Sequence, residues 1–321
     1  MIGILGGTGF FGSNLLVHLN ERGLACKAFA RHAPPPPCHA RLRRALAETQ
    51  VVTGDLADSG AVGAFLDGCE AVVFVVSHLL PSSTPEEIDR CLTWFPAAFQ
   101  RLLGHCATAG VRHFLFVSSG GTVYGDDERR VAFTEDHPLK PRSGYGALCA
   151  LLEGLVTSAH LQRGLPCTIV RVGNLYGPYK RPSDRQGLIE NITFRAINGE
   201  PIRIFGDGSE VRDYVYVEEA AERIGEVLSR PATDQVFNLG TGHGTSTEDA
   251  VELVLRALDL PRPPVTLERE RPCDVAHVVL DSSRFAAQFG RACEIPLAEG
   301  LQRYRAHLVE TGILRDPWTK A

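Results

Sequence analysis

The sequence predicts an α/β fold, a doubly wound parallel sheet with helices on both faces and a smaller C-terminal lobe that binds the substrate. Short apolar runs alternate with helical patterns through the first half of the chain, which is the order that βαβ units produce. The runs are rich in valine, as in 71–76, and few polar residues interrupt them. Strands of a parallel sheet that is covered on both faces have this composition.

Six apolar runs are the predicted strands, and four segments between them carry apolar residues at helical spacing. The strands are expected at 2–5, 26–30, 51–56, 71–76, 114–117 and 167–172, and the helices at 13–19, 62–67, 85–109 and 145–162. Longer loops follow residue 173. We therefore expect a large domain over 1–172, to which 212–240 returns, and a smaller lobe over most of 173–321.

A glycine-rich turn with Gly6, Gly9 and Gly12 joins the first predicted strand to the first helix. Glycines at this spacing allow a tight turn, a close approach to a pyrophosphate and close helix packing. The helix N-terminus offers backbone N–H groups to the anion, those of Phe10 and Phe11 among them. Strand, turn and helix in this order predict a Rossmann-type domain that binds a dinucleotide.

The carboxyl ends of the next strands form the expected adenosine site. An acidic residue usually holds the ribose hydroxyls of NAD at the end of the second strand, but Arg31 stands here. Arg31 favours NADP if it binds a 2'-phosphate, and it leaves NAD open if it only covers the adenine. Four more residues are expected beside the cofactor: Asp55, Leu56, Val76 and Ser77.

The composition argues against several classes of partner. A net charge of -5 and a pI near 6.1 provide no basic field for nucleic acid or anionic lipid. Nine cysteines without a Cys-x-x-Cys pair suit reduced thiols in the cytoplasm, and neither a disulfide framework nor a metal site. No apolar run approaches the roughly 18 residues of a membrane span.

Six motifs follow one another along the chain and together resemble those of one family. They are Gly6-x-x-Gly9-x-x-Gly12, Ser118-Ser119 with Tyr124-Gly125, Ser143-Gly-Tyr145, Arg171-x-x-Asn174-x-Tyr176-Gly177-Pro178, Arg212-Asp213 and Arg271-x-x-Asp274. The chain resembles the extended short-chain dehydrogenases/reductases that act on nucleotide-diphosphate sugars as epimerases and dehydratases. The resemblance covers nearly the whole chain and implies an enzyme of this class.

The resemblance implies that Tyr145 takes the proton of the sugar C4 hydroxyl while hydride leaves C4 for the nicotinamide. Ser119 or Gly120 matches the serine or threonine that hydrogen-bonds the same oxygen, and only Ser119 has a hydroxyl. Cys149 replaces the family's lysine four residues after the tyrosine. A cation about 4 Å away at an effective dielectric of about 20 is worth roughly 4 kcal/mol, or three pKa units, so we expect a weaker base.

Two interpretations of Cys149 stay open: a small helix residue that packs against the cofactor, or a thiol that transfers a proton. The positive charge of an oxidised nicotinamide ring would supply part of the missing electrostatic effect on Tyr145. The full set of expected catalytic residues is therefore Tyr145, Ser119, Cys149 and Thr122.

Gly120-Gly121 stand where the family's 4,6-dehydratases carry an Asp-Glu pair. Two redox-neutral reactions remain: water elimination across C5 and C6 with return of hydride to C4, which gives a 5,6-ene exo-glycal, or epimerisation at C4. The acid and base of an elimination are open among Thr122, Lys180, His78 and Cys149. A third alternative is a protein that binds the dinucleotide or nucleotide sugar without catalysis.

The resemblance also implies a binding site for the UDP half of the substrate, formed by Asn174, Phe205, Arg212, Arg271 and Asp274. Arginine suits a diphosphate because its charge is permanent and its donors form a planar fork. The expected substrate is a UDP-hexosamine such as UDP-GlcNAc. NAD is the expected cofactor, with NADP as the alternative, because the reaction must start from the oxidised form. A homodimer is possible through the helices at 85–109 and 145–162.

A small residue at Val278 is consistent with room for the N-acetyl group of such a sugar. Family members specific for plain hexoses tend to carry a bulky tyrosine at this position, seven residues after Arg271.

Overall fold

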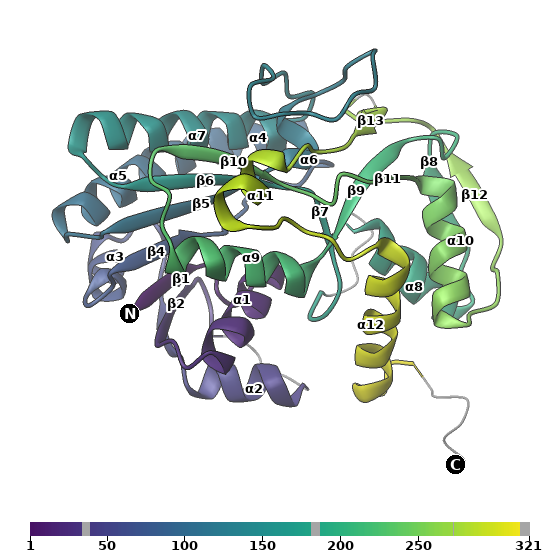
Figure 1. Ribbon diagram of the computed structural model, residues 1–321, viewed down its shortest axis with the longest axis horizontal. Coiled ribbons are helices and arrows are strands. Elements are labelled where there is room, and N and C mark those ends of the chain that lie inside the picture. The colour runs from purple at the N-terminus through teal and green to yellow at the C-terminus, as the bar shows by residue number, and fades with distance from the viewer. Residues whose placement is uncertain (34–38, 181–186, 272, 315–321) are drawn as a thin grey trace.

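The computed structural model describes residues 1–33, 39–180, 187–271 and 273–314, and two layered units are visible in it (Figure 1). The larger unit contains a seven-stranded parallel sheet in the order β10-β6-β5-β4-β1-β2-β3. Its strands are β1 (Ile2–Leu5), β2 (Cys26–Ala30), β3 (Gln50–Thr53), β4 (Ala71–Phe74), β5 (His113–Ser119), β6 (Cys167–Val172) and β10 (Gln235–Leu239). The predicted doubly wound sheet is confirmed.

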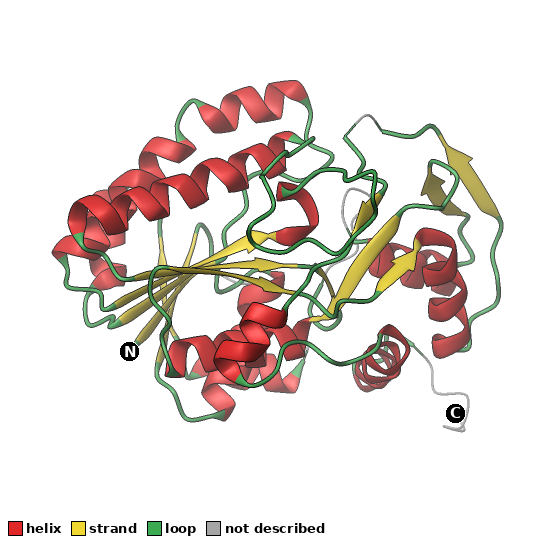
Figure 2. Ribbon diagram, turned by 45° about the horizontal axis from the view of Figure 1, so that its top comes forward, coloured by secondary structure: helices red, strands yellow, loops and turns green. Residues whose placement is uncertain are grey.

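Helices cover both faces of this sheet (Figure 2). One face packs against α3 (Ser59–Leu66), α4 (Pro85–Leu92), α5 (Phe95–Thr108) and α7 (Gly144–Arg163). The other packs against α1 (Phe10–Glu21), α2 (Ala40–Ala47), α9 (Val217–Ser229) and α11 (Ser283–Phe289). Each face has its own apolar core, which explains why the strands lack an alternating polar pattern.

The smaller unit is built from short strands and three helices. One sheet has the order β11-β9-β13, with β7 also paired to β9, and β8 pairs with β12. The elements are β7 (Asn174–Tyr176), β8 (Ile202–Phe205), β9 (Val211–Tyr216), β11 (Gly244–Ser246), β12 (Val265–Glu268), β13 (His277–Val278), α8 (Leu188–Asn198), α10 (Thr247–Leu258) and α12 (Leu297–Glu310).

The chain crosses between the two units more than once. After β6 it enters the small lobe, and it returns to the large sheet with α9 and β10, residues 217–239. The expected return over 212–240 therefore starts a few residues too early, because β9 pairs within the small lobe. Helix α11 comes late in the sequence but also belongs to the large unit, where Phe285 and Phe289 pack against Phe237.

The single helix expected at 85–109 is wrong, since α4 ends at Leu92 and α5 begins at Phe95. Pro96 explains the break: it has no N–H for the carbonyl four residues earlier, and its ring excludes a continuous helix. In the first turn of a new helix the missing N–H costs nothing. Thr84 starts α4 with a capping box that includes Glu87.

Helix α7 places the central tyrosine at the carboxyl end of the sheet. Ser143 caps the helix by accepting a hydrogen bond from the Gly146 N–H at 3.0 Å. A small element, α6 (Gly120–Val123), follows β5 directly and packs against α7. None of the helices in the described ranges has both the length and the apolar composition to cross a membrane.

Candidate active site

A cavity of about 1050 Å³ opens at the carboxyl ends of the strands and continues into the small lobe. It contains most of the predicted residues: Gly9, Phe10, Phe11, Arg31, Val76, Ser77, Ser119, Thr122, Tyr145, Cys149, Asn174, Phe205, Arg212, Arg271 and Asp274. A second cavity of about 230 Å³ adjoins it and is lined by Gly6, Asp55 and Leu56 together with Arg31. The predicted cofactor, catalytic and diphosphate residues therefore lie along one continuous groove.

The glycine turn has the geometry that a dinucleotide pyrophosphate requires. Gly6 has φ +86°, in the left-handed region that favours glycine. A Cβ on Gly12 would overlap the carbonyl oxygen of Gly6, so α1 can approach the turn only with glycine there. No side chain caps α1, and its first turn carries no acidic residue. The N-terminus of α1 thus fits an anion.

The adenosine end of the groove has no acidic residue at the end of β2. Arg31 is exposed there and lines both cavities. The Asp55 carboxylate accepts a hydrogen bond from the Ala57 N–H at 2.8 Å and so shapes its own turn. His78, an open candidate for acid or base, lines only the second cavity, between Trp94 and Phe95.

Three side chains meet at the catalytic end of the groove. Tyr145 lies in the first turn of α7 and is hydrogen-bonded to Ser119, the last residue of β5. Cys149 lies one turn further along α7 and is hydrogen-bonded to Tyr145 and to the backbone of Ser119. Thr122 donates to the Ser119 carbonyl at 3.5 Å. Ser119, rather than Gly120, therefore provides the hydroxyl beside the tyrosine.

Burial controls the protonation of this group. It raises the pKa of Tyr145 well above its usual value, and the nearby Cys149 raises it further. Burial also raises the pKa of the Cys149 thiol to about 12. Both groups hold their protons near neutral pH, which argues against Cys149 as a thiolate base. The pKa of His78 falls to about 4, mainly because of burial, so its imidazole is neutral and a weak acid.

The two glycines after Ser119 lie close to side chains of other segments. A Cβ on Gly120 would lie 2.6 Å from Leu280 Cδ1, and one on Gly121 would lie 2.5 Å from the side-chain oxygen of Asn174. Leu280 and Asn174 would therefore have to turn aside before an Asp-Glu pair could stand here.

A buried ion pair lies directly behind the catalytic residues. Glu153, one turn after Cys149, accepts a 2.5 Å hydrogen bond from Ser118 and pairs with Arg171 of β6 at 2.7 Å. Arg171 also donates to the hydroxyl of Tyr124 at 2.9 Å and to the backbone carbonyl of Glu135. Every one of these groups has a hydrogen-bond partner, as buried charges require.

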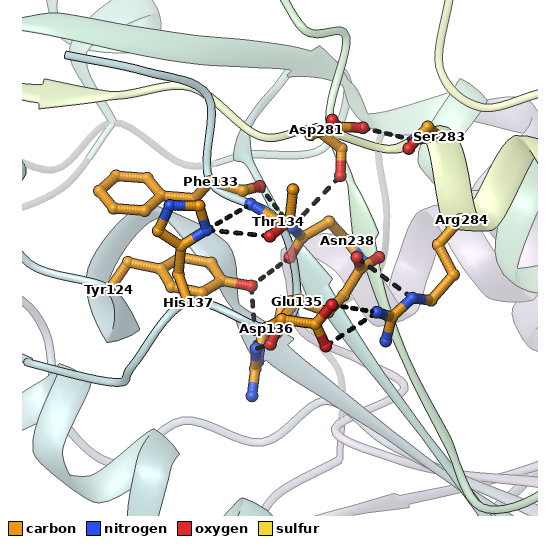
Figure 3. A network of polar contacts seen from close by, with 11 residues as sticks. Tyr124, Phe133, Thr134, Glu135, Asp136, His137, Asn238, Asp281, Ser283 and Arg284 are labelled. Carbon is orange, nitrogen blue, oxygen red and sulfur yellow. Dashed lines mark hydrogen bonds and ion pairs between the residues drawn. The ribbon is translucent and has the colours of Figure 1, made fainter. Parts of the chain in front are cut away.

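The network continues to the surface (Figure 3). The Tyr124 hydroxyl donates to Asn238 at 2.6 Å, and the Asn238 side chain donates to the Phe133 carbonyl at 2.7 Å. Glu135 accepts from the Asn238 N–H at 2.8 Å, and the exposed Arg284 pairs with Asp136 at 2.9 Å. These contacts attach the loop after α6 to β10 and α11.

The opposite end of the groove carries the predicted diphosphate residues. The Arg271 guanidinium lies 3.5 Å from the centre of the Phe205 ring and 4.0 Å from the Asp274 carboxylate. Arg212 donates to its neighbouring carbonyl at 2.9 Å, and Asn174 starts β7. These side chains gather from four separate segments of the small lobe, which only the tertiary fold brings together.

Val278 does not line the groove, contrary to the expectation that it leaves room for an N-acetyl group. It lies in β13 opposite Arg212 of β9 and is only 2% exposed, packed in the cluster around Val123 and Leu280. Val275 lines the groove instead. The short β13 pairing turns the Val278 side chain into the core, a register that the sequence pattern did not reveal.

The sequence did not point to several charged residues of the groove, which are Glu190, Arg142, Arg195 and Arg203. Glu190, in the first turn of α8, is 1% exposed and lies 3.3 Å from Lys180 Nζ. Lys180 Nζ is also 4.9 Å from the centre of the Phe10 ring. The glutamate follows no recognised motif, so the sequence carried no signal for this pair.

Among the described residues, one grouping offers potential metal ligands: His160, Cys167 and Asp234 lie within 4.8 Å of one another. They are at the amino ends of β6 and β10, away from the groove, and His160 already pairs with Asp234 at 2.7 Å. The grouping is an ion pair beside a buried thiol and has no connection to the candidate active site.

Comparison with known proteins decides the family. Residues 2–240 match the NAD dependent epimerase/dehydratase family. The chain belongs to this family. Its members include the UDP-glucose 4-epimerase of Mycolicibacterium smegmatis, 31% identical over 63% of this chain and 64% of that protein. The dTDP-glucose 4,6-dehydratase of Streptomyces griseus is 32% identical over 63% of this chain and 60% of that protein.

The family likeness extends to the fold. A UDP-glucose 4-epimerase of Thermus thermophilus, solved in complex with NAD, has a TM-score of 0.85 and 26% identity, covering 95% of this chain and 98% of that chain. The match to each of the two curated relatives named above spans less than two thirds of that protein's length. Epimerases and dehydratases are both among the similar proteins, so the family by itself does not select the reaction.

Proposed function

We propose that this family member converts a UDP-hexosamine, UDP-GlcNAc, without net oxidation, by transient oxidation at C4, elimination of water across C5 and C6, and return of hydride to C4. The product would be a 5,6-ene exo-glycal, which makes the protein a UDP-N-acetylglucosamine 5,6-dehydratase. The observation that carries the proposal is the Tyr145–Ser119 pair in one groove with Arg212 and Arg271.

The side chains of the groove have distinct tasks in this reaction. Tyr145 takes the proton of the C4 hydroxyl, and Ser119 holds the same oxygen through a hydrogen bond. Arg212 and Arg271 bind the diphosphate and so fix the sugar beneath the tyrosine. NAD, when bound at the α1 N-terminus and Arg31, supplies a hydride acceptor that also returns the hydride. The raised pKa of Tyr145 favours uptake of the C4 proton over its release at the end.

Gly120-Gly121 argue against the standard 4,6-dehydratase route, in which the family's Asp-Glu pair supplies an acid and a base. An elimination across C5 and C6 with return of hydride to C4 must therefore take its acid and base from other residues of the groove.

A 4-epimerase is the second candidate, supported by the names of the M. smegmatis and T. thermophilus proteins. It uses the same C4 oxidation and the same Tyr145, but the ketone turns over before hydride returns. A binding protein without catalysis is a weaker third candidate, since it would have no use for the hydrogen-bonded Tyr145 and Ser119.

Incubation with UDP-GlcNAc in deuterated water, followed by NMR and mass spectrometry, tests these candidates. Loss of one water with a new exocyclic alkene supports the dehydratase. An unchanged mass with inverted C4 would show an epimerase, and no reaction with several UDP-sugars would leave the binding protein. Tyr145→Phe is the matched control and should lower either reaction by about 100-fold or more.

The cofactor and the assembly complete the proposal. Binding of NAD and NADP to cofactor-free protein should be tighter for NAD, and tighter NADP binding would assign Arg31 to a 2'-phosphate. We place the protein in the cytoplasm as a homodimer formed through α7, which exposes Leu151 by 44% and Leu161 by 77%. Sedimentation of Leu161→Glu against wild type tests the dimer.

A further inference from the structure

Lys180 and Glu190 form a pair of opposite charges in the groove, apart from the predicted diphosphate ligands. Lys180 follows β7 and Glu190 lies in α8, and both line the groove at the junction between the small lobe and the cofactor turn. Lys180 Nζ stands 4.9 Å from the centre of the Phe10 ring, next to the first turn of α1. The predicted diphosphate ligands Arg212 and Arg271 come from other segments.

The carboxylate of Glu190 is only partly satisfied. Its Oε1 accepts a hydrogen bond from the Gly177 N–H at 3.1 Å. Its Oε2 has no hydrogen bond among the described residues, although the Lys180 ammonium lies 3.3 Å away. A buried carboxylate oxygen without a hydrogen bond is costly to maintain, and a donor that reached it would relieve that cost.

The surrounding backbone is shaped around this pair. Gly187, just before α8, has φ +93°, and a Cβ there would lie 2.5 Å from both Lys180 Nζ and Glu190 Oε2. The Asn14 side chain donates to the Pro178 carbonyl at 2.9 Å, which holds the segment before Lys180 against α1. The pair therefore has a defined place beside the cofactor turn, as an acid and a base in one site require.

From this geometry we propose that Glu190 and Lys180 are the base and the acid of the water elimination. The inference rests on the proposed dehydratase function. Once C4 is a ketone, Glu190 takes the C5 proton, and the electrons of the C5–H bond form the C5=C6 double bond. The C6–O bond breaks, its electrons leave with the oxygen, and Lys180 donates a proton so that water departs.

The pair restores itself after each elimination. Glu190 ends the step as a neutral carboxylic acid and Lys180 as a neutral amine, 3.3 Å apart. Transfer of one proton from the acid to the amine regenerates both charges without a further reactant. A single adjacent pair on one side of the sugar also predicts that the C5 proton and the C6 hydroxyl leave from the same face.

The other open candidates have weaker positions. His78 lines the second cavity and not the main groove. Burial raises the pKa of the Cys149 thiol to about 12, and it is hydrogen-bonded to Tyr145 and the Ser119 backbone. The hydroxyl of Thr122 is bonded to the Ser119 carbonyl and is not ionised. Lys180 is thus the candidate of the sequence that stands beside a carboxylate in the groove.

Glu190→Gln and Lys180→Arg separate the two steps when each is incubated with UDP-GlcNAc in deuterated water. In Glu190→Gln, the rates of deuterium exchange at C5 and of water elimination should each fall by about 100-fold or more. Lys180→Arg keeps the charge, but arginine is a poor proton donor. Deuterium exchange at C5 should therefore continue in this variant, while the elimination of water stops. Glu48→Gln, in an exposed pair with Arg44 on α2, is the matched control and should behave as wild type.

Calorimetric titration with UDP should give equal affinities for all four proteins, which separates chemistry from binding and folding. Water loss at the wild-type rate in Glu190→Gln would overturn the inference and leave the dehydratase function intact. If the wild-type protein yields a C4 epimer or no product, the proposed dehydratase function and the assignment of Glu190 and Lys180 are both overturned.

Discussion

Two buried ion pairs lie in and behind the groove, and they differ in how completely their charges are satisfied. Glu153 and Arg171 meet at 2.7 Å behind the groove, and hydrogen bonds from Ser118 and to Tyr124 complete their shell. Lys180 and Glu190 stand 3.3 Å apart inside the groove, with one carboxylate oxygen free of hydrogen bonds among the described residues. The hydrogen bonds of the first pair are complete, whereas one oxygen of the second pair has a charge beside it but no hydrogen bond.

The largest expected effect is on stability, when the first pair is broken. Glu153→Gln leaves the Arg171 charge buried without its counterion, and loss of one partner of a buried pair costs about 3–5 kcal/mol. Urea unfolding followed by circular dichroism measures the change in the free energy of unfolding. A loss below about 1 kcal/mol would show that this pair is no more structural than the one in the groove.

Cys149→Lys places a cation between Tyr145 and Glu153 and probes the effect of the missing charge. Burial and the nearby Cys149 raise the pKa of Tyr145, so the base form becomes available only as pH rises. A neighbouring cation favours the charged tyrosinate and lowers that pKa. The acid limb of the pH profile of kcat/KM should move to lower pH by about two units, within the roughly three-unit limit of a close cation.

An unchanged acid limb in Cys149→Lys would show that the nicotinamide charge already supplies the effect. Cys149→Ala is the control, because it removes the thiol that raises the pKa of Tyr145 without adding charge, and it should move the limb to lower pH by less than Cys149→Lys does. The cavity beside Cys149 gives the longer lysine side chain room.

Ser118→Ala weakens the first pair without breaking it. The hydroxyl donates to the buried Glu153 carboxylate at 2.5 Å, and hydrogen bonds to charged groups are worth about 1.5–3 kcal/mol. Unfolding by urea should show a loss of about 2 kcal/mol. The same change at the exposed Ser59, which contacts His105 at 3.3 Å, should cost less than about 0.5 kcal/mol.

The smallest effect is expected for Glu190→Gln, measured as stability and not as activity. The glutamine oxygen can still accept from the Gly177 N–H, and Lys180 is 12% exposed and can turn toward water. The free energy of unfolding should fall by less than about 1 kcal/mol. A loss as large as that of Glu153→Gln would make the second pair structural and remove the contrast between the two.

The sequence predicted the parts of this site that depend on local pattern. The bounds of β1, β2 and β6 match the expected strands. Valine-rich strands and a glycine turn can be recognised in the sequence because a few adjacent residues determine each of them.

The missed features depend on contacts between distant residues or on a single side chain within a pattern. Pro96 divided a helix whose apolar spacing continued through it, and the register of β13 turned Val278 inward. Glu190 gained its importance only from Lys180, which the fold brings beside it. No period or motif in the sequence records such a pairing.

The place of β10 at the edge of the large sheet has a consequence for synthesis of the chain. β6 is made before the segments of the small lobe from β7 to β9, and its partner β10 follows only after them. Until then β6 is an open edge with unpaired backbone groups and apolar side chains, the kind of surface on which chains aggregate. A nascent chain that stalls in the small lobe would therefore depend on chaperones more than the finished protein does.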